Sequence, residues 1–305
     1  FEFSLFGKMT VGILTLQKHR SGIWVSELLQ RLSSIAINVE LVNIETAIYD
    51  PLQLPWKIVV NRVSDAAPPA AVKATLAVLE AARLQGIPVV NGTSCFSIGC
   101  NKISHHAVLA SVGLAVPKSR VCRSPADAIE SSALLRFPLL WKPNSGGFGA
   151  GIVSLPTAER LAELVQHEKL LMPEDGMALL QEQVEPRDGL TYRVWVLAGK
   201  VQCAVQVVPG DLGEGSAGSC MCSAVGPQSW KVPSKIAEGV EAVMRACGAD
   251  CGSVELLFAD DTAKYGEEPL YFDVNMLSTL PSGDVVGGDP WQALADFVVS
   301  RLPPQ

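Results

Sequence analysis

Two short segments near the end of the chain place three oxygen-bearing side chains where they could hold a metal ion. Residues 252–257 (GSVELL) and 271–275 (YFDVN) are rich in β-branched and aromatic residues, and the polar segment between them predicts a hairpin connection. Asp273 and Asn275 are two apart, so they share one face of their strand, and Glu255 joins them if the strands pair in register. Such oxygen ligands suit Mg²⁺. The alternative is an ordinary hairpin with a solvated acidic face.

A glycine-rich loop in the middle of the chain has the composition of a phosphate-binding segment. Residues 144–151 (NSGGFGAG) join two predicted strands, unlike a P-loop, in which Gly-Lys-Ser/Thr opens a helix. Glycines let backbone N–H groups approach a polyphosphate, and Lys142, at the end of the preceding strand, would add a compact positive charge. The glycines expected at the phosphates are Gly146, Gly147 and Gly149. The alternative is a hairpin tip whose glycines serve turn geometry.

Length and composition narrow the class of protein. A chain of 305 residues is long for one compact unit and favours two or three lobes. Its hydrophobic fraction of 48% and charged fraction of 18% are typical of globular proteins. A formal net charge of −7 argues against general binding to nucleic acid or anionic membranes. No apolar run reaches the roughly 20 residues that span a bilayer, and residues 1–8 lack a signal-peptide cleavage pattern. We therefore expect a cytoplasmic protein.

The cysteines and histidines give little sign of a site of their own. The eight cysteines are scattered through apolar segments, which favours reduced, mostly buried thiols. Cys247 and Cys251 are four apart, and Cys220 and Cys222 are two apart, and these spacings do not match the paired pattern of a zinc site. The two adjacent histidines at 105–106 lie in a predicted helix and are expected on its surface rather than in a site.

The first third of the chain alternates strands and helices. This alternation predicts βαβ units and a parallel sheet with right-handed crossovers. No glycine fingerprint follows the first strand, so we do not expect a dinucleotide site there. The predicted strands are residues 9–15, 35–42, 56–60 and 87–90, and the predicted helices are 22–32 and 69–84.

The remainder of the chain mixes helices with strands that do not alternate regularly. Residues 209–228 are rich in Gly and Ser and predict a mobile loop over a site. The predicted helices are 102–112, 125–135, 157–167, 231–247 and 291–302. Besides the metal hairpin, strands are predicted at 118–122, 137–143, 152–155 and 178–184, with a long hairpin over 191–208.

Four segments together resemble the ATP-grasp superfamily, and most closely its branch of the ribosomal-protein glutamate ligase and related carboxylate–amine ligases. They are 101–102 (NK), 141–143 (WKP) with the glycine loop, 181–185 (QEQVE) followed by Tyr192-Arg193, and 254–257 with 273–275. The resemblance implies an α/β ATP-grasp fold, in which a Rossmann-like N-terminal lobe precedes two α+β lobes that clamp ATP. The corresponding domains would be residues 1–94, 95–178 and 179–305.

The resemblance also implies roles for the charged residues. Glu255, Asp273 and Asn275 become ligands for two Mg²⁺ ions that bridge the phosphates of ATP, with Mn²⁺ as an alternative ion. Lys102 and Lys142 become phosphate contacts, and Lys142 also becomes a catalytic residue.

The base and the ribose of ATP are expected at a hinge strand between the two lobes. The residues that the resemblance places there are Gln181, Glu182, Gln183 and Val184. The glutamate ligase has an acidic residue where this chain has Thr191, so Glu185 or Asp188 would hold the ribose. Arg193 would stabilise the transferring phosphoryl group or a tetrahedral oxyanion, because its planar donors suit either.

The loop expected to contact phosphate and substrate differs in sequence from that of the glutamate ligase. The glutamate ligase has an Arg-Ser-Asn segment there, whereas residues 213–219 (GEGSAGS) hold neither Arg nor Asn. After Asn275 the family often has a proline soon followed by a glycine, and in this chain the segment up to its Pro-Ser-Gly is two or three residues longer. The usual substrate therefore does not carry over.

The resemblance implies an ATP-dependent ligase that joins a small-molecule carboxylate to an amine through an acyl phosphate, without a nucleic-acid or membrane partner. A small-molecule kinase like the inositol-phosphate kinases shares the fold, but it needs a dense basic cleft, and the basic residues here are thinly spread. A nucleotide-binding protein without catalysis is the third class, and the intact metal triad argues against it. The substrates and the oligomeric state stay open.

Overall fold

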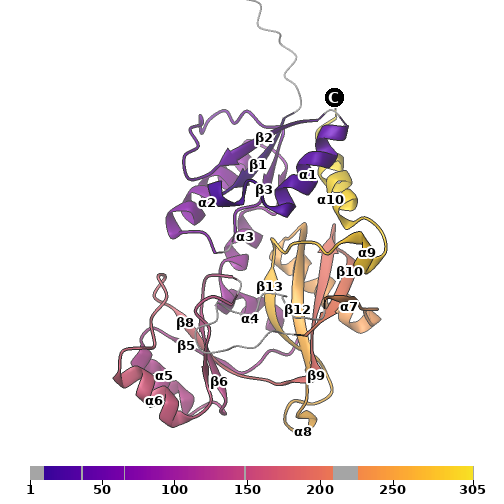
Figure 1. Ribbon diagram of the computed structural model, residues 1–305. Coiled ribbons are helices and arrows are strands. Elements are labelled where there is room, and N and C mark those ends of the chain that lie inside the picture. The colour runs from indigo at the N-terminus through magenta and orange to yellow at the C-terminus, as the bar shows by residue number, and fades with distance from the viewer. Residues whose placement is uncertain (1–9, 36, 65, 148, 209–225, 305) are drawn as a thin grey trace, which may run out of the picture.

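The structure is a computed structural model that describes residues 10–35, 37–64, 66–147, 149–208 and 226–304. These residues form three sheets, two of four strands and one of five (Figure 1). In the view of Figure 1 the first sheet lies at the top, the second at the lower left and the third at the lower right. No helix in the described ranges combines the length and the apolar character needed to cross a membrane.

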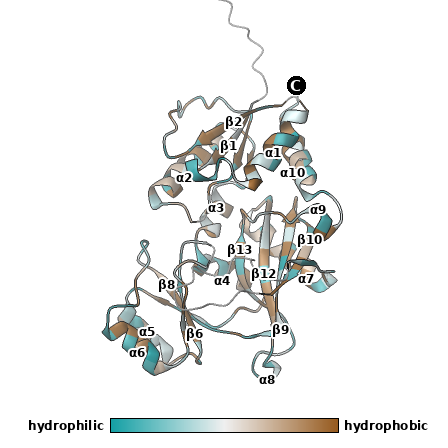
Figure 2. Ribbon diagram, viewed as in Figure 1, coloured by the Kyte–Doolittle hydropathy of each residue, from teal (hydrophilic) through white to brown (hydrophobic). Residues whose placement is uncertain are grey.

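The first sheet is parallel, in the order β2-β1-β3-β4. Its two central strands, β1 and β3, are buried, whereas the edge strand β2 is partly exposed, and Figure 2 colours this sheet mainly as hydrophobic. Val11 and Ile13 pack in the same cluster as α1, whereas Leu14 packs in that of α2, so the two helices cover opposite faces. The elements are β1 (Thr10–Thr15), a 3₁₀ turn (Gln17–His19), α1 (Ile23–Ser34), β2 (Asn38–Asn43), β3 (Ile58–Asn61), α2 (Pro69–Leu84) and β4 (Val89–Val90).

The second sheet is antiparallel, in the order β5-β8-β6-β7, and carries the glycine loop between β6 and β7. Helices α5 and α6 lie together beside this sheet (Figure 1), and their apolar residues share a core with Trp141 and Leu180. The elements that lead into and form this part are α3 (Thr93–Gly99), α4 (Lys102–Ser111), β5 (Ser119–Cys122), α5 (Pro125–Ser132), β6 (Leu139–Pro143), β7 (Val153–Leu155), α6 (Ala158–Gln166) and β8 (Ala178–Glu182).

The third sheet is antiparallel, in the order β11-β10-β9-β12-β13. Helix α7 contacts β9, β10 and β12 on one face, and Val254 and Leu256 of β12 are buried in the core on that side. The elements are β9 (Pro186–Leu197), β10 (Lys200–Val207), β11 (Gln228–Ser229), α7 (Ser234–Cys247), β12 (Cys251–Ala259), α8 (Thr262–Tyr265) and β13 (Leu270–Asn275).

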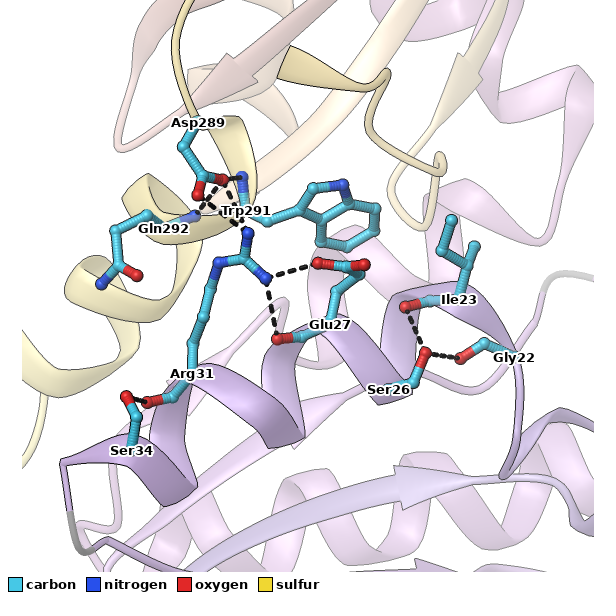
Figure 3. Close-up of polar contacts among 9 residues, drawn as sticks. All are labelled: Gly22, Ile23, Ser26, Glu27, Arg31, Ser34, Asp289, Trp291 and Gln292. Atoms are coloured by element: carbon cyan, nitrogen blue, oxygen red, sulfur yellow. Dashed lines mark hydrogen bonds and ion pairs between the residues drawn. The ribbon is translucent and has the colours of Figure 1, made fainter. Parts of the chain in front are cut away.

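The end of the chain returns to the first lobe. After α9 (Gly283–Val286), helix α10 (Pro290–Ser300) packs beside α1. Arg31 of α1 donates to both oxygens of Asp289 at 2.9 and 2.8 Å, and Asp289 caps α10 by accepting from Trp291 N and Gln292 N (Figure 3). The rings of Trp24 and Trp291 pack edge to face, with their centroids 6.2 Å apart. We propose that the three domains divide after residues 94 and 178.

Most predicted elements occur within a few residues of their expected ranges, and α2 has the expected bounds. Three short helices, α3, α8 and α9, were not predicted. Each is too short to show a helical period, and α8 begins at a local cap, in which the Asp261 side chain accepts from Lys264 N. Residues 209–225 of the predicted mobile loop lie outside the described residues.

Asn91, directly after β4, joins the first sheet to the third. It is 1% exposed and adopts φ +57°, a conformation that Asn tolerates better than most residues. Its Oδ1 accepts from Asp250 N at 3.0 Å and Cys251 N at 3.1 Å, and its Nδ2 donates to Cys251 O at 3.0 Å and Met276 O at 2.8 Å. One side chain therefore satisfies backbone groups beside both β12 and β13.

We expect Asn91→Ala to lower the free energy of unfolding by at least about 2 kcal/mol, because several buried backbone groups would lose their partners. Urea unfolding measures this. The control is Asn38→Ala on the exposed side of β2, which should change stability by less than about 0.5 kcal/mol. Equal effects of the two substitutions would show that Asn91 does not join the sheets.

Candidate functional site

A row of three charged side chains crosses the third sheet. Glu255 of β12 lies opposite Arg193 of β9 on one side and opposite Asp273 of β13 on the other. Arg193 and Glu255 form an ion pair, and their side chains are 19% and 18% exposed. Asn275 lies two residues beyond Asp273 and opposite Ser253. The register expected from the sequence is present, so Glu255, Asp273 and Asn275 share one face.

The carboxylates of this row have opposite pKa shifts. Burial raises the pKa of Glu255, and the charge of Asp273 adds to this, although Arg193 acts against it. Burial also acts to raise the pKa of Asp273, but the contact with His105 and the charges of Lys102 and Arg193 outweigh it and hold this pKa well below its usual range. Like charges directly opposite one another in a sheet repel. A cation beside the row would relieve that repulsion.

The residues present fit a hard divalent ion. The Asp273 side chain is 25% exposed and lines a cleft, as do Glu255 and Asn275. Asn275 Oδ1 accepts from Leu277 N at 2.8 Å, which fixes the amide and leaves the oxygen a second lone pair. Two carboxylates and one amide oxygen are the ligands that Mg²⁺ prefers. The fit is therefore favourable in both chemistry and access.

Lys102 and Lys142 line the same cleft. Lys102 Nζ donates to the carbonyl of Gly146 in the glycine loop at 2.5 Å. Burial lowers the pKa of Lys142 to about 8, with a further contribution from the charge of Lys102, while Asp273 and Glu255 act to raise it. Both lysines therefore lie within the field of the carboxylate row.

Asn144 anchors the start of the glycine loop to helix α4. It is 1% exposed; its carbonyl accepts from Lys102 N at 2.9 Å and its Oδ1 from Ile103 N at 3.1 Å. Its Nδ2 donates to Asp175 at 2.8 Å. Beyond this anchor Gly146 has φ +116° and open space around its Cα, where a side chain would be strained. The loop thus combines a fixed base with glycine backbone facing the cleft.

One cleft collects most of the predicted site residues. It encloses about 1450 Å³, part of it open to solvent, and the first lobe contributes Trp24 and Arg62, whose guanidinium lies 5.3 Å from the Trp24 ring centre. The predicted residues that line it are Lys102, Lys142, Gly146, Gly147, Gly149, Arg193, Glu255, Asp273 and Asn275.

The predicted hinge residues do not line this cleft. Glu182 N donates to Lys118 O at 2.8 Å and Gln183 N to Pro138 O at 2.9 Å, so two of the expected hinge amides already have partners. The Glu182 carboxylate is buried and accepts from Tyr265 Oη at 3.1 Å, while Gln181 is 3% exposed. Among the described residues, the Val184 amide has no hydrogen-bond partner.

The ribose candidates differ from each other in their contacts. Glu185 is exposed and accepts from Gln183 Nε2 at 2.9 Å, and its carbonyl accepts from Asp260 N. Asp188 is exposed at φ +57° in β9. Both side chains are accessible, and their assignment to the ribose stays a prediction.

His105 corrects an expectation from the sequence. The histidines were expected on a helix surface, but His105 is 1% exposed and its Nδ1 lies 3.2 Å from Asp273 Oδ1. His106 is partly buried, with its Nδ1 3.0 Å from Ser119 Oγ, and burial lowers its pKa to about 4. The sequence signal for His105 was its spacing of three from Lys102, which places both on one side of α4.

A second row lies one step along the same sheet face. Trp195 and Ser253 are opposite each other and two residues from Arg193 and Glu255 respectively. Trp195 Nε1 and Ser253 Oγ are buried without a hydrogen-bond partner among the described residues, as is Ser278 Oγ. Buried polar groups are normally met by water or a ligand. Of these three residues, Ser278 lines the cleft.

Within the described ranges, no group of three or more His, Cys, Asp and Glu side chains is placed to hold a metal. Cys247 and Cys251 are buried free thiols, and burial raises the pKa of both, to about 11 and about 12. Cys220 and Cys222 lie outside the described residues.

Comparison with known proteins agrees with this geometry. Residues 99–244 match the family described as "RimK-like ATP-grasp domain", a range that includes both lysines, the glycine loop and Arg193. A "Probable alpha-L-glutamate ligase" of Pasteurella multocida is 26% identical over 179 residues, 58% of this chain and 55% of that protein. A "D-alanine--D-alanine ligase" of Glaesserella parasuis is 32% identical over 127 residues, 41% of this chain and 40% of that protein. The chain thus spans about half the length of the curated relatives it matches.

A solved structure matches nearly the whole chain. The ATP-grasp ligase PsnB, complexed with a phosphomimetic variant of its minimal precursor, Mg and ADP, has a TM-score of 0.70 at 14% identity, covering 96% of this chain and 98% of that one. At this identity the likeness shows the fold alone. The chain therefore has the ATP-grasp fold, and the match of residues 99–244 to the RimK-like family agrees with the resemblance in its sequence.

Proposed function

We propose that this protein is an ATP-dependent carboxylate–amine ligase that forms an amide bond through an acyl phosphate and releases ADP and phosphate. The observation that carries the proposal is that the row of Arg193, Glu255 and Asp273 lines one cleft together with Lys102 and Lys142. The names of both curated relatives, a glutamate ligase and a D-alanine ligase, support the same reaction class.

Two groups of residues in the cleft would hold ATP. Lys102, Lys142 and the bare backbone of the glycine loop would bind phosphate oxygens in the cleft. The base would lie beyond the residues that line the cleft, where Val184 N–H would meet it. Glu255, Asp273 and Asn275 would hold Mg²⁺, or Mn²⁺ with the same preference for oxygen, and the ion would neutralise charge on the phosphates. The fixed anchor at Asn144 places the loop before the nucleotide arrives.

Arg193 would serve the reacting centre. A substrate carboxylate oxygen attacks the γ-phosphorus as the bond to the bridging oxygen of ADP breaks, and an amine then attacks the acyl phosphate and expels phosphate. Charge builds on the transferring group in the first step and on a tetrahedral oxyanion in the second. Arg193 has planar donors and is held in place by Glu255, so it can stabilise either without reorganising.

The first test separates a ligase from a kinase. Purified protein with ATP and Mg²⁺ is screened against amino acids, small acids and short peptides, since the fold neighbour PsnB was solved with a precursor peptide. We expect ADP formation to require a carboxylate, and hydroxylamine to trap a hydroxamate when the amine is withheld. A stable phosphate ester on an alcohol, with no amide and no free phosphate, would replace the ligase with a kinase.

A second prediction concerns Arg193. Arg193→Ala should lower kcat by about 100-fold or more while changing the KM for ATP little, because the stabilised charge develops only in the transition state. Arg193→Lys keeps the charge but not the planar donors and should recover part of the rate. Arg245→Ala, an exposed arginine on α7, is the control. A rise in KM alone for Arg193→Ala would assign Arg193 to ground-state binding.

A third prediction follows from the pKa of Lys142, which burial lowers to about 8. Phosphates favour the charged amine, so nucleotide binding raises this pKa and takes up protons above about pH 8, and affinity falls as the pH rises further. Calorimetry of a non-hydrolysable ATP analogue in buffers of different ionisation enthalpy measures the uptake. Lys142→Met should abolish it, whereas Lys200→Met at an exposed position should not. Uptake that persists in Lys142→Met would assign the proton to another group.

A further inference from the structure

Helix α4 carries two groups that face the cleft from one side. Lys102 is its first residue, and His105 follows three residues later, on the same side of the helix. Lys102 reaches the glycine loop and His105 reaches β13. One rigid turn of helix therefore spans the distance between the phosphate lysine and a candidate metal ligand.

His105 is held from two directions. Its Nε2 lies 3.1 Å from Gly99 O at the end of α3, and because a carbonyl only accepts, Nε2 donates there. Its Nδ1 lies 3.2 Å from Asp273 Oδ1, and since Nε2 already donates to Gly99 O, a hydrogen bond to this carboxylate needs the second ring proton on Nδ1, that of the imidazolium. Val274 N, 3.4 Å from Nδ1, is then a neighbour of the ring and not its hydrogen-bond donor. The imidazole ring is thus fixed between α3 and β13, with little freedom to turn.

The start of α4, at the other end of the turn that carries His105, is fixed as well. Asn144 accepts from the first two amides of α4, those of Lys102 and Ile103, so the helix cannot slide relative to the glycine loop. Because His105 contacts Asp273, the fixed position of α4 also fixes the position of the Asp273 carboxylate.

We propose that His105 is a positioning residue that orients the Asp273 carboxylate for the ion, an inference that rests on the proposed function. The contact engages Asp273 Oδ1 and leaves Oδ2 for the ion. Hydrogen-bond partners of metal ligands typically account for 10- to 100-fold in metal affinity. His105 acts through Asp273 and touches neither the nucleotide nor the ion.

Two substitutions separate this role from simple core packing. His105→Gln places an amide nitrogen near the position of Nε2, so it keeps the donor to Gly99 O and loses the contact with Asp273. His105→Asn places an amide nitrogen near the position of Nδ1, so it keeps a donor to Asp273. A residue that only fills space would give similar results for both variants.

The measurement is calorimetric binding of a non-hydrolysable ATP analogue over a range of Mg²⁺ concentrations and in EDTA, after thermal unfolding has shown both variants to be folded. We expect His105→Gln to need about 10-fold more Mg²⁺ for half-maximal binding, with its affinity in EDTA unchanged. His105→Asn should recover most of this loss. In an Asp273→Asn background, His105→Gln should have no further effect on Mg²⁺ dependence, because residues in contact are non-additive.

The outcomes that overturn the inference are distinct from failure of the proposed function. An unchanged Mg²⁺ dependence in His105→Gln, an equal loss in both variants, or additive effects with Asp273→Asn would each reject the positioning role while leaving the ligase proposal standing. Absence of Mg²⁺-dependent nucleotide binding by the unsubstituted protein would reject both. If His105→Gln does not fold, the inference is judged on His105→Asn, which must then bind with nearly unaltered Mg²⁺ dependence.

Discussion

The candidate site depends on the central position of β12 in the third sheet. Antiparallel pairing on both sides fixes which residues stand opposite Glu255, and a slip of one residue would turn every side chain to the other face. The polar face alone would not favour this register, because it sets the Glu255 and Asp273 carboxylates against each other. The opposite face does: Val254 and Leu256 are fully buried in the core with α7. Burial of apolar residues on the opposite face thus fixes the register that sets the Glu255 and Asp273 carboxylates side by side. A positive charge is then needed to offset the repulsion between them.

Three sheets contribute to one cleft, so their relative placement matters as much as each sheet. Apolar packing is non-directional and tolerates small shifts. Buried polar side chains with several partners do not, because each displaced group would lose a hydrogen bond in a medium of low dielectric constant. Asn91 ties the first sheet to β12 and β13, Asn144 ties the glycine loop to α4, and Arg31 with Asp289 ties the last helix to the first lobe. These directional contacts set the cleft's geometry.

Local patterns in the sequence predicted the strands, the glycine loop and the shared face of Asp273 and Asn275, because these follow from period and turn chemistry within a few residues. The contact of His105 with Asp273 joins residues 168 apart in sequence, and no local pattern reports it. The hinge shows a similar limit. The sequence identified the strand that ends at Glu182, but only the fold shows that the amides of Glu182 and Gln183 are already bonded to Lys118 and Pro138.

The charge of the cleft differs in kind from that of the whole chain. The protein is acidic overall, with a net charge of −7, yet Lys102, Lys142 and Arg193 converge on one cavity. They are not free to neutralise a triphosphate alone, because Arg193 is paired with Glu255 and the lysines lie within the field of Asp273. A nucleotide that arrives with its own divalent cations supplies charge to both sides at once: the ions meet the opposed carboxylates, and the phosphates meet the lysines. The balance therefore suits a metal–nucleotide complex. Among the described residues Arg62 is the further arginine that lines the cleft, which is little positive charge for a second substrate rich in phosphate and favours the proposed ligase over a kinase.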